Sequence, residues 1–226
     1  MDYTEILWFA VLAVFALSLL AQWLVGSTYR RYAKIAARKG LPAEEIAAEI
    51  MAYYGVHIPV KQIAGELTDN YDPRAKQLNL SQGVYGSSSI AAYGIAAHEA
   101  GHAIQHAKSF MPLLWRNSIF PAANFGSNLG PWLFIAGLFF GITPLIDLGL
   151  IFFAFAVAFS FITLPVELDA SRRAVAALKN RRLLAATELP GAQKVLGAAA
   201  LTYLAATLMA VLQMLRFIAL RNSRRN

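Results

Sequence analysis

Long uncharged runs dominate the pattern of hydrophobic and polar positions along the chain. They cover 6–25, 117–146, 148–166 and 195–215, and an α-helix of about 20 apolar residues crosses about 30 Å of hydrocarbon. Gly141-Ile142-Thr143-Pro144 divides the central stretch, 118–166, into a helical hairpin. The pattern predicts about four transmembrane helices, although a re-entrant segment in place of one of them fits the same runs.

Composition supports a membrane protein. Of the 226 residues, 58% are hydrophobic and 15% are charged, whereas soluble domains carry about 25% charged residues. The absence of cysteine excludes a disulfide scaffold and any thiolate zinc site. Asp2 and Glu5 near the N-terminus favour a retained anchor over a cleaved signal peptide.

The distribution of charge predicts the topology. The net charge is +7, and sixteen of the twenty basic residues lie in 26–116 and 167–194. The positive-inside rule places these parts on the cytoplasmic side of a cell inner (plasma) membrane, and we expect no nucleic-acid partner. Arg221, Arg224 and Arg225 would then lie outside, so either this tail is an exception or the fourth segment does not fully cross.

The segment 26–116 reads as mainly helical. Basic residues predict a helix at 29–39, and apolar spacing predicts a second helix from Pro42 to Gly55. Short strands are expected at 58–60 and 76–80, separated by a turn-rich stretch. Ser87-Ser88-Ser89 offers N-caps for a helix over about 90–107.

That last helix contains His98-Glu99-Ala100-Gly101-His102, an H-E-x-x-H motif. Residues four apart lie on one face of an α-helix, so two imidazoles can converge on one metal ion. Glu99 can reach a water on that ion as a general base without being a ligand. The motif predicts one Zn²⁺ per chain and metal-assisted hydrolysis of a peptide bond.

A catalytic zinc needs a third protein ligand. His106 lies ~12 Å along the helix axis from His98, which is too far for a straight helix to close on one ion. Glu167, where the third span ends, is the better candidate and completes a His, His, Glu site in the connection 167–194. Asp169 and Ser171 could hold a ligand imidazole by its other ring nitrogen.

Several other polar positions allow two interpretations each. The side chains of Tyr93 and His106 could stabilise an oxyanion, or they could contribute only to packing. The stretch 77–81 could accept a substrate as a neighbouring strand or belong to local packing. Asn117, Asn124 and Asn128 share one helical stripe, which suits either a substrate path or interhelical hydrogen bonds.

Several separate segments resemble the YugP-like family of neutral zinc metallopeptidases, small bacterial membrane proteins. They are Gly65-Glu66-Leu67-Thr68-Asp69, Tyr71-Asp72-Pro73, Leu80-Ser81, His98 to His106, and Pro165 to Ala174. The stretch after Glu167 is also similar to the Glu-x-x-Ala-Asp signature of HtpX-type proteases, with Ser171 in place of the aspartate. This resemblance implies a membrane metalloprotease and supports Glu167 as a ligand.

The sequence thus predicts a mainly α membrane protein with a small zincin-like cytoplasmic α+β element that bears the HExxH helix. Its expected function is zinc-dependent endopeptidase action on a membrane-associated protein or peptide, with His98, His102 and Glu167 as ligands and Glu99 as the base. One rival is a membrane adaptor or chaperone-like protein with a structural metal site. Another is a zinc enzyme acting on a non-peptide amide or lipid. The oligomeric state stays open.

Overall fold

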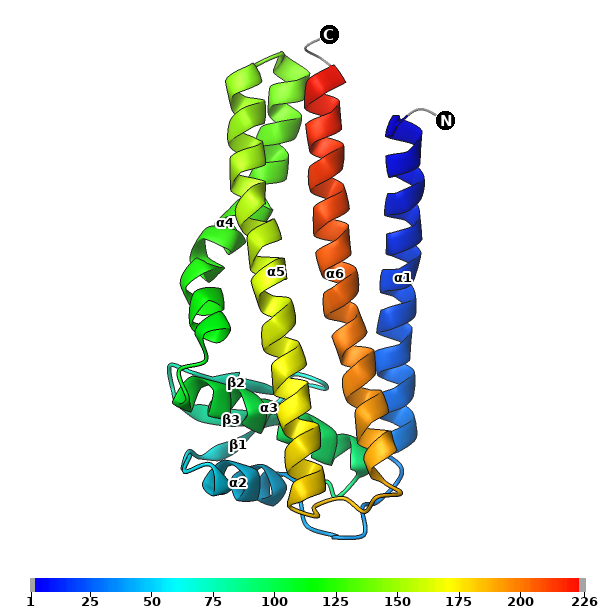
Figure 1. The fold of residues 1–226 in the computed structure, drawn as a ribbon, viewed down its shortest axis with the longest axis vertical. Coiled ribbons are helices and arrows are strands. Elements are labelled where there is room, and N and C mark those ends of the chain that lie inside the picture. The colour runs from blue at the N-terminus through cyan, green and yellow to red at the C-terminus, as the bar shows by residue number, and fades with distance from the viewer. Residues whose placement is uncertain (1–2, 224–226) are drawn as a thin grey trace. The chain divides into compact units, whose positions relative to one another are not determined.

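The computed structural model describes residues 3–223, which form six helices and three strands (Figure 1). In chain order these elements are α1 Tyr3–Tyr32, α2 Ala43–Tyr53, β1 Val60–Ile63, β2 Asn70–Asp72, β3 Gln77–Ser81, α3 Ile90–Ala107, α4 Met111–Phe140, α5 Thr143–Asn180 and α6 Leu189–Ser223. The mainly helical architecture with a small sheet is as predicted. The chain divides into two compact units, and α1, α5 and α6 contribute residues to both.

The first unit contains residues 3–21, 112–165 and 202–223 of the described chain. Glycines bring α4 and α5 close together: a Cβ on Gly126 would lie 2.1 Å from the Phe152 carbonyl oxygen, and one on Gly149 would lie 2.6 Å from the Phe134 amide nitrogen. Small residues at such an interface let two helix backbones approach closely. The hairpin predicted around Gly141 is therefore present, with its break at residues 141–142.

Three helices of the described chain are long and apolar enough to cross a membrane: Ile6–Tyr32, Thr143–Asn180 and Leu189–Ser223. The helix α4, which is as long as α1 and contains Pro121, Pro131 and three asparagines, is not one of these three. Three of the four expected spans are thus supported, and the span in α4 stays a prediction. The predicted division of the chain into the segments 6–25, 26–116, 118–166, 167–194 and 195–215 also stays a prediction.

Two residues of the asparagine stripe interact within α4. Asn128 donates a hydrogen bond to the backbone carbonyl of Asn124 at 2.7 Å. This bond satisfies one amide group locally, and both roles considered for the stripe stay predictions.

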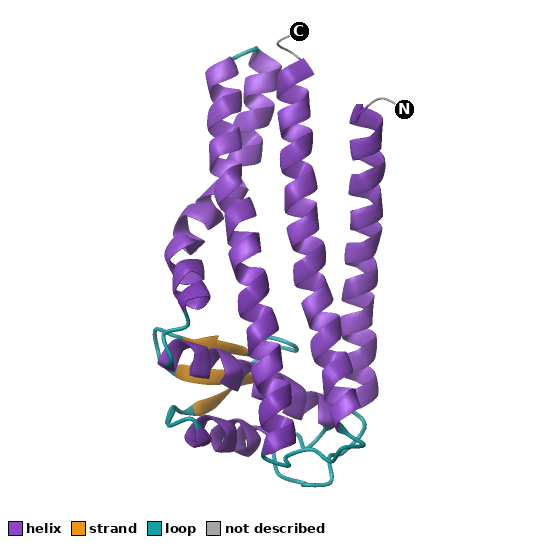
Figure 2. Ribbon diagram, in the orientation of Figure 1, coloured by secondary structure: helices purple, strands orange, loops and turns teal. Residues whose placement is uncertain are grey.

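The second unit contains residues 22–111 and 166–201 and has its own hydrophobic core. In this unit α2 packs against α3, and α3 also contacts β2 and β3. The strands, orange in Figure 2, form a sheet with the order β1-β3-β2. The strand β1 runs parallel to β3, with Val60 opposite Leu78, and β2 runs antiparallel to it, with Tyr71 opposite Leu78.

This topology corrects two expectations. The stretch 77–81 is the central strand, with residues 78–81 paired to β1 and residues 77–79 paired to β2, so it has no continuous free edge for a substrate strand. The stretch expected to form only a turn contains the strand β2, Asn70–Asp72. The side chain of Asn70 accepts a hydrogen bond from the side chain of Asn79 at 3.0 Å.

The prediction of a basic helix at 29–39 is also wrong about the residue at which the helix ends. The helix α1 stops at Tyr32, and the following segment pairs instead with the residues before α3. Ala37 donates to the Ser88 carbonyl at 2.8 Å, and Ile90 donates to the Ile35 carbonyl at 2.9 Å. These long-range bonds satisfy backbone groups that a continued helix would have used internally.

The helix α3 matches its predicted range. Its N-cap is Ser89, whose side-chain oxygen accepts a hydrogen bond from the Ala92 amide at 3.2 Å. This bond satisfies one of the free N–H groups of the first turn. Most residues of α3 are buried, so the helix that carries the motif is held within the core of its unit.

Candidate metal centre

His98 and His102 on α3 meet Glu167 on α5, all within the second unit. One potential ligand atom from each residue lies within 4.8 Å of the others. The Glu167 Oε2 atom is 3.2 Å from His98 Nε2 and 3.4 Å from His102 Nε2. His102 and Glu167 are buried, and His98 is partly buried. These three side chains could hold one metal ion.

The other nitrogen of each imidazole has a partner of its own. His98 Nδ1 lies 3.1 Å from the Ser171 hydroxyl, and His102 Nδ1 lies 3.0 Å from Gln105 Oε1. An amide oxygen only accepts hydrogen bonds, so His102 carries a proton on Nδ1, and Nε2 is the ring nitrogen that faces Glu167. Both imidazoles therefore direct Nε2 toward Glu167, which is the orientation that metal binding needs.

Gln105 connects the two helices, and its role was not anticipated from the sequence. Its Nε2 group donates to the Val166 carbonyl and to Asp169 Oδ2, both at 2.8 Å. Asp169 in turn accepts a hydrogen bond from Arg173. Asp169 thus acts on His102 through Gln105, whereas Ser171 contacts His98 directly. The available signal was a polar residue one turn after His102 in a helix predicted to hold the metal ligands.

The local charge favours a cation between these residues. Burial alone would lower the pKa of His102, but the hydrogen bond that its imidazole donates to Glu167 and the negative charges of Glu99 and Glu167 outweigh this effect and raise the pKa. The environment that stabilises a proton on the imidazole also stabilises a divalent ion at the same place. Glu99, which follows His98, is buried as well and contributes negative charge without belonging to the ligand group.

Gly101, inside the motif, permits the approach of the two helices. A Cβ at this position would lie 2.8 Å from the Ala170 carbonyl oxygen and 3.3 Å from its Cα atom. No side chain fits there without moving α5. The absence of a Cβ at Gly101 therefore lets Glu167 come within reach of both histidines.

The remaining candidates lie elsewhere. His106 is outside the ligand group, and its Nδ1 atom is 2.7 Å from the hydroxyl of Tyr71 on β2. Tyr93 is fully buried, and its hydroxyl donates to the Leu41 carbonyl at 2.6 Å, which favours a packing role. Arg172 lines a shallow groove together with Ser171 and Gln193.

The chain is similar to known proteins over most of its length. Residues 7–222 match the family described as "Putative neutral zinc metallopeptidase". A Bacillus subtilis (strain 168) protein described as "Putative membrane protease YugP" is 43% identical over 211 residues, which are 93% of this chain and 94% of the relative. No solved structure matches the chain significantly.

Replacing Gly101 with alanine should disrupt the centre. The new methyl group would collide with the Ala170 carbonyl, and overpacking of this kind costs about 1–3 kcal/mol of stability. We expect a lower unfolding temperature and weaker zinc binding in detergent. Gly94→Ala on the same helix is the control, because its nearest neighbour would be the Ala192 Cβ at an ordinary 3.5 Å. Equal unfolding temperatures and equal zinc binding in the two variants would contradict the role of the close contact at Gly101.

Gln105→Leu should weaken metal binding while keeping the side-chain volume similar. It leaves His102 Nδ1 without its acceptor, and loss of such a partner typically lowers metal affinity by about 10–100-fold. Competition with a chelating dye measures the affinity. Gln62→Leu, on the exposed face of β1, is the control and should bind zinc like the wild type. Unchanged affinity in Gln105→Leu would show that the orientation of His102 does not depend on Gln105.

Proposed function

Because the chain belongs to this family of zinc metallopeptidases, we propose that it is a membrane-embedded zinc endopeptidase. One Zn²⁺ binds to His98, His102 and Glu167, and Glu99 is the general base. The observation that carries the proposal is the convergence of three ligand atoms within 4.8 Å, with the outer nitrogen of each imidazole already held by a partner.

The donor set fits zinc. Two neutral imidazoles and one carboxylate are a common ligand set of catalytic zinc, and they leave one coordination position open. Structural zinc sites are closed by four protein ligands. The described residues supply three in this group, which favours hydrolysis over a structural metal in an adaptor protein.

The chemistry divides between the ion and the chain. Bound zinc would supply a water of lowered pKa, about 7, and would polarise the scissile carbonyl. Glu99 would accept a proton from the attacking water and deliver it to the nitrogen of the leaving amine. His98 and His102 keep their Nδ1 atoms hydrogen-bonded to Ser171 and Gln105, which preserves the orientation of both rings.

The proposed substrate is a peptide bond of a membrane-associated protein. Three candidate spans support association with the bilayer, and the cytoplasmic side of the inner membrane is the proposed location because the basic residues concentrate in 26–116 and 167–194. Arg221, one of the basic residues that oppose this topology, is paired with Asp147. Its charge is therefore largely neutralised within its own unit, which reduces the conflict with the positive-inside rule.

Zinc content should depend on the three proposed ligands. We expect about one zinc per chain in the purified wild type and in His106→Ala, and a loss of zinc in His98→Ala and Glu167→Ala. Elemental analysis of folded protein in detergent measures this. His106→Ala is the matched control, because it removes an imidazole of the same helix that lies outside the ligand group. Zinc that survives without Glu167 but not without His106 would overturn the ligand set.

Glu99→Gln should keep zinc and lose peptidase activity. General acid–base catalysis contributes about 10²–10⁴-fold, so hydrolysis of an unstructured protein such as casein should fall by at least about 100-fold. New amino termini report the cleavage. Glu45→Gln is the control, since this glutamate lies exposed on α2. Full activity in Glu99→Gln would show that Glu99 is not the general base. If the wild type hydrolyses small amides but does not cleave casein, the substrate is not a peptide.

A further inference from the structure

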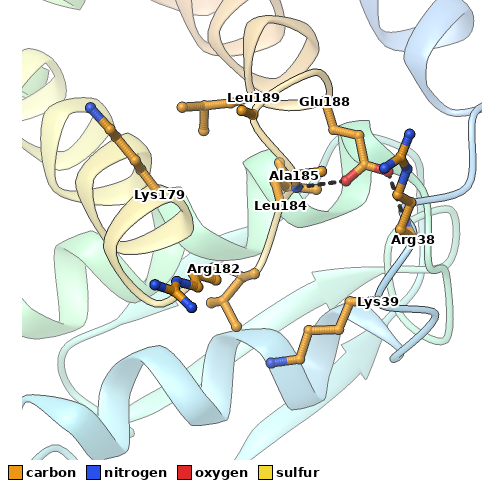
Figure 3. Close-up of a pocket in the computed structure, with 10 residues that line it drawn as sticks. Arg38, Lys39, Lys179, Arg182, Leu184, Ala185, Glu188 and Leu189 are labelled. Carbon is orange, nitrogen blue, oxygen red and sulfur yellow. Dashed lines mark hydrogen bonds between the residues drawn. The ribbon is translucent and has the colours of Figure 1, made fainter.

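A cavity of about 640 Å³ opens in the second unit, and none of its lining residues belongs to the metal-ligand group. Figure 3 shows that its cationic side chains come from two stretches: Arg38 and Lys39 precede α2, whereas Lys179 and Arg182 lie at the end of α5 and in the following turn. Leucines of the turn before α6 complete the lining. The cavity has the size of a small-molecule site.

Glu188 is the single acidic residue of this lining, and it braces the two stretches. Its carboxylate oxygens accept hydrogen bonds from the Arg38 amide at 2.9 Å and from the Ala185 amide at 2.8 Å (Figure 3). Glu188 is buried, so these bonds tie the segment before α2 to the turn before α6. The walls of the cavity are thereby held at a defined separation.

The four cations outnumber the carboxylates available to them. Lys39 pairs with Glu49 at 2.9 Å, and Arg181 shares the same carboxylate at 3.6 Å. Within residues 3–223, the side chains of Arg38, Lys179 and Arg182 form no ion pair. Because Glu188 is the one carboxylate of the lining and Glu49 pairs with Lys39, the cavity keeps a surplus of positive charge.

The backbone at Arg182 closes the C-terminus of α5. Its φ angle is +54°, and the Leu183 amide donates a hydrogen bond to the Leu178 carbonyl at 2.9 Å, as in a helix that ends with a left-handed residue. This cap turns the chain so that Arg182 lies in the cavity lining beside the buried Leu183 and Leu184.

We propose that this cavity binds a phosphate-bearing ligand. Guanidinium groups bind phosphate through two parallel hydrogen bonds, and ammonium groups add charge. The apolar floor suits the uncharged part of an organic phosphate. A phospholipid headgroup and a soluble organic phosphate share this chemistry, so the experiment includes both.

The test uses the full chain purified in a neutral detergent. Pyrophosphate binding is measured by titration calorimetry, and phosphatidylglycerol binding is measured against phosphatidylcholine in mixed micelles. We expect Arg38→Gln/Lys179→Gln to weaken binding at least tenfold. Both side chains are exposed, so folding should be unaffected. Arg182→Asn, which tolerates the left-handed backbone, should weaken it independently.

Lys61→Gln/Lys194→Gln is the matched control, because it removes the same charge from exposed positions outside the cavity. It should bind like the wild type. Dependence of pyrophosphate binding on the cavity cations identifies a soluble phosphate, and dependence of phosphatidylglycerol binding alone identifies a lipid headgroup. Equal weakening by cavity and control variants, or no binding of either probe, overturns the proposal.

Discussion

The close contact between Gly101 on α3 and the backbone of Ala170 on α5 is the constraint on which the candidate metal centre depends. A histidine pair spaced by one helical turn supplies two ligands on its own. The third ligand must come from another element, and its carboxylate has to lie within a few ångström of both imidazoles. Where the backbones approach as they do at Gly101, Glu167 reaches both imidazoles.

The same contact places a polar network in an apolar interior. Gln105, Asp169 and Ser171 engage both imidazoles or each other across the two helices. Buried polar groups are costly unless they are paired, and a fully paired network holds its members in one arrangement. In this unit the pairing orients the ligands through hydrogen bonds that already exist within the protein chain. The network therefore positions the site as well as stabilising the helix packing.

The parts that could be predicted from the sequence are those set by local patterns. The helix 90–107, its Ser89 cap, the hairpin break and the histidine spacing all follow from neighbouring residues, and α3 has the predicted bounds. Glu167 could be found because its type and its place at the end of an apolar run limited the choices. The end of α1, the strand β2 and the central place of β3 depend on pairing between distant segments. Gln105 was missed because an amide on a helix shows its partners only when the second helix is present.

The helix α5 is continuous from Thr143 to Asn180 and is one of the three candidate membrane helices. Glu167, Asp169 and Ser171 all lie on it, so the proposed centre is completed by a helix that is also a candidate membrane span. A newly made copy in which α5 has not yet reached its register against α3 has the two histidines but lacks the Glu167 carboxylate. On the proposed assignment, such a copy cannot complete its metal site. Biogenesis and activation would then be a single event, which would keep an immature copy from cleaving other proteins.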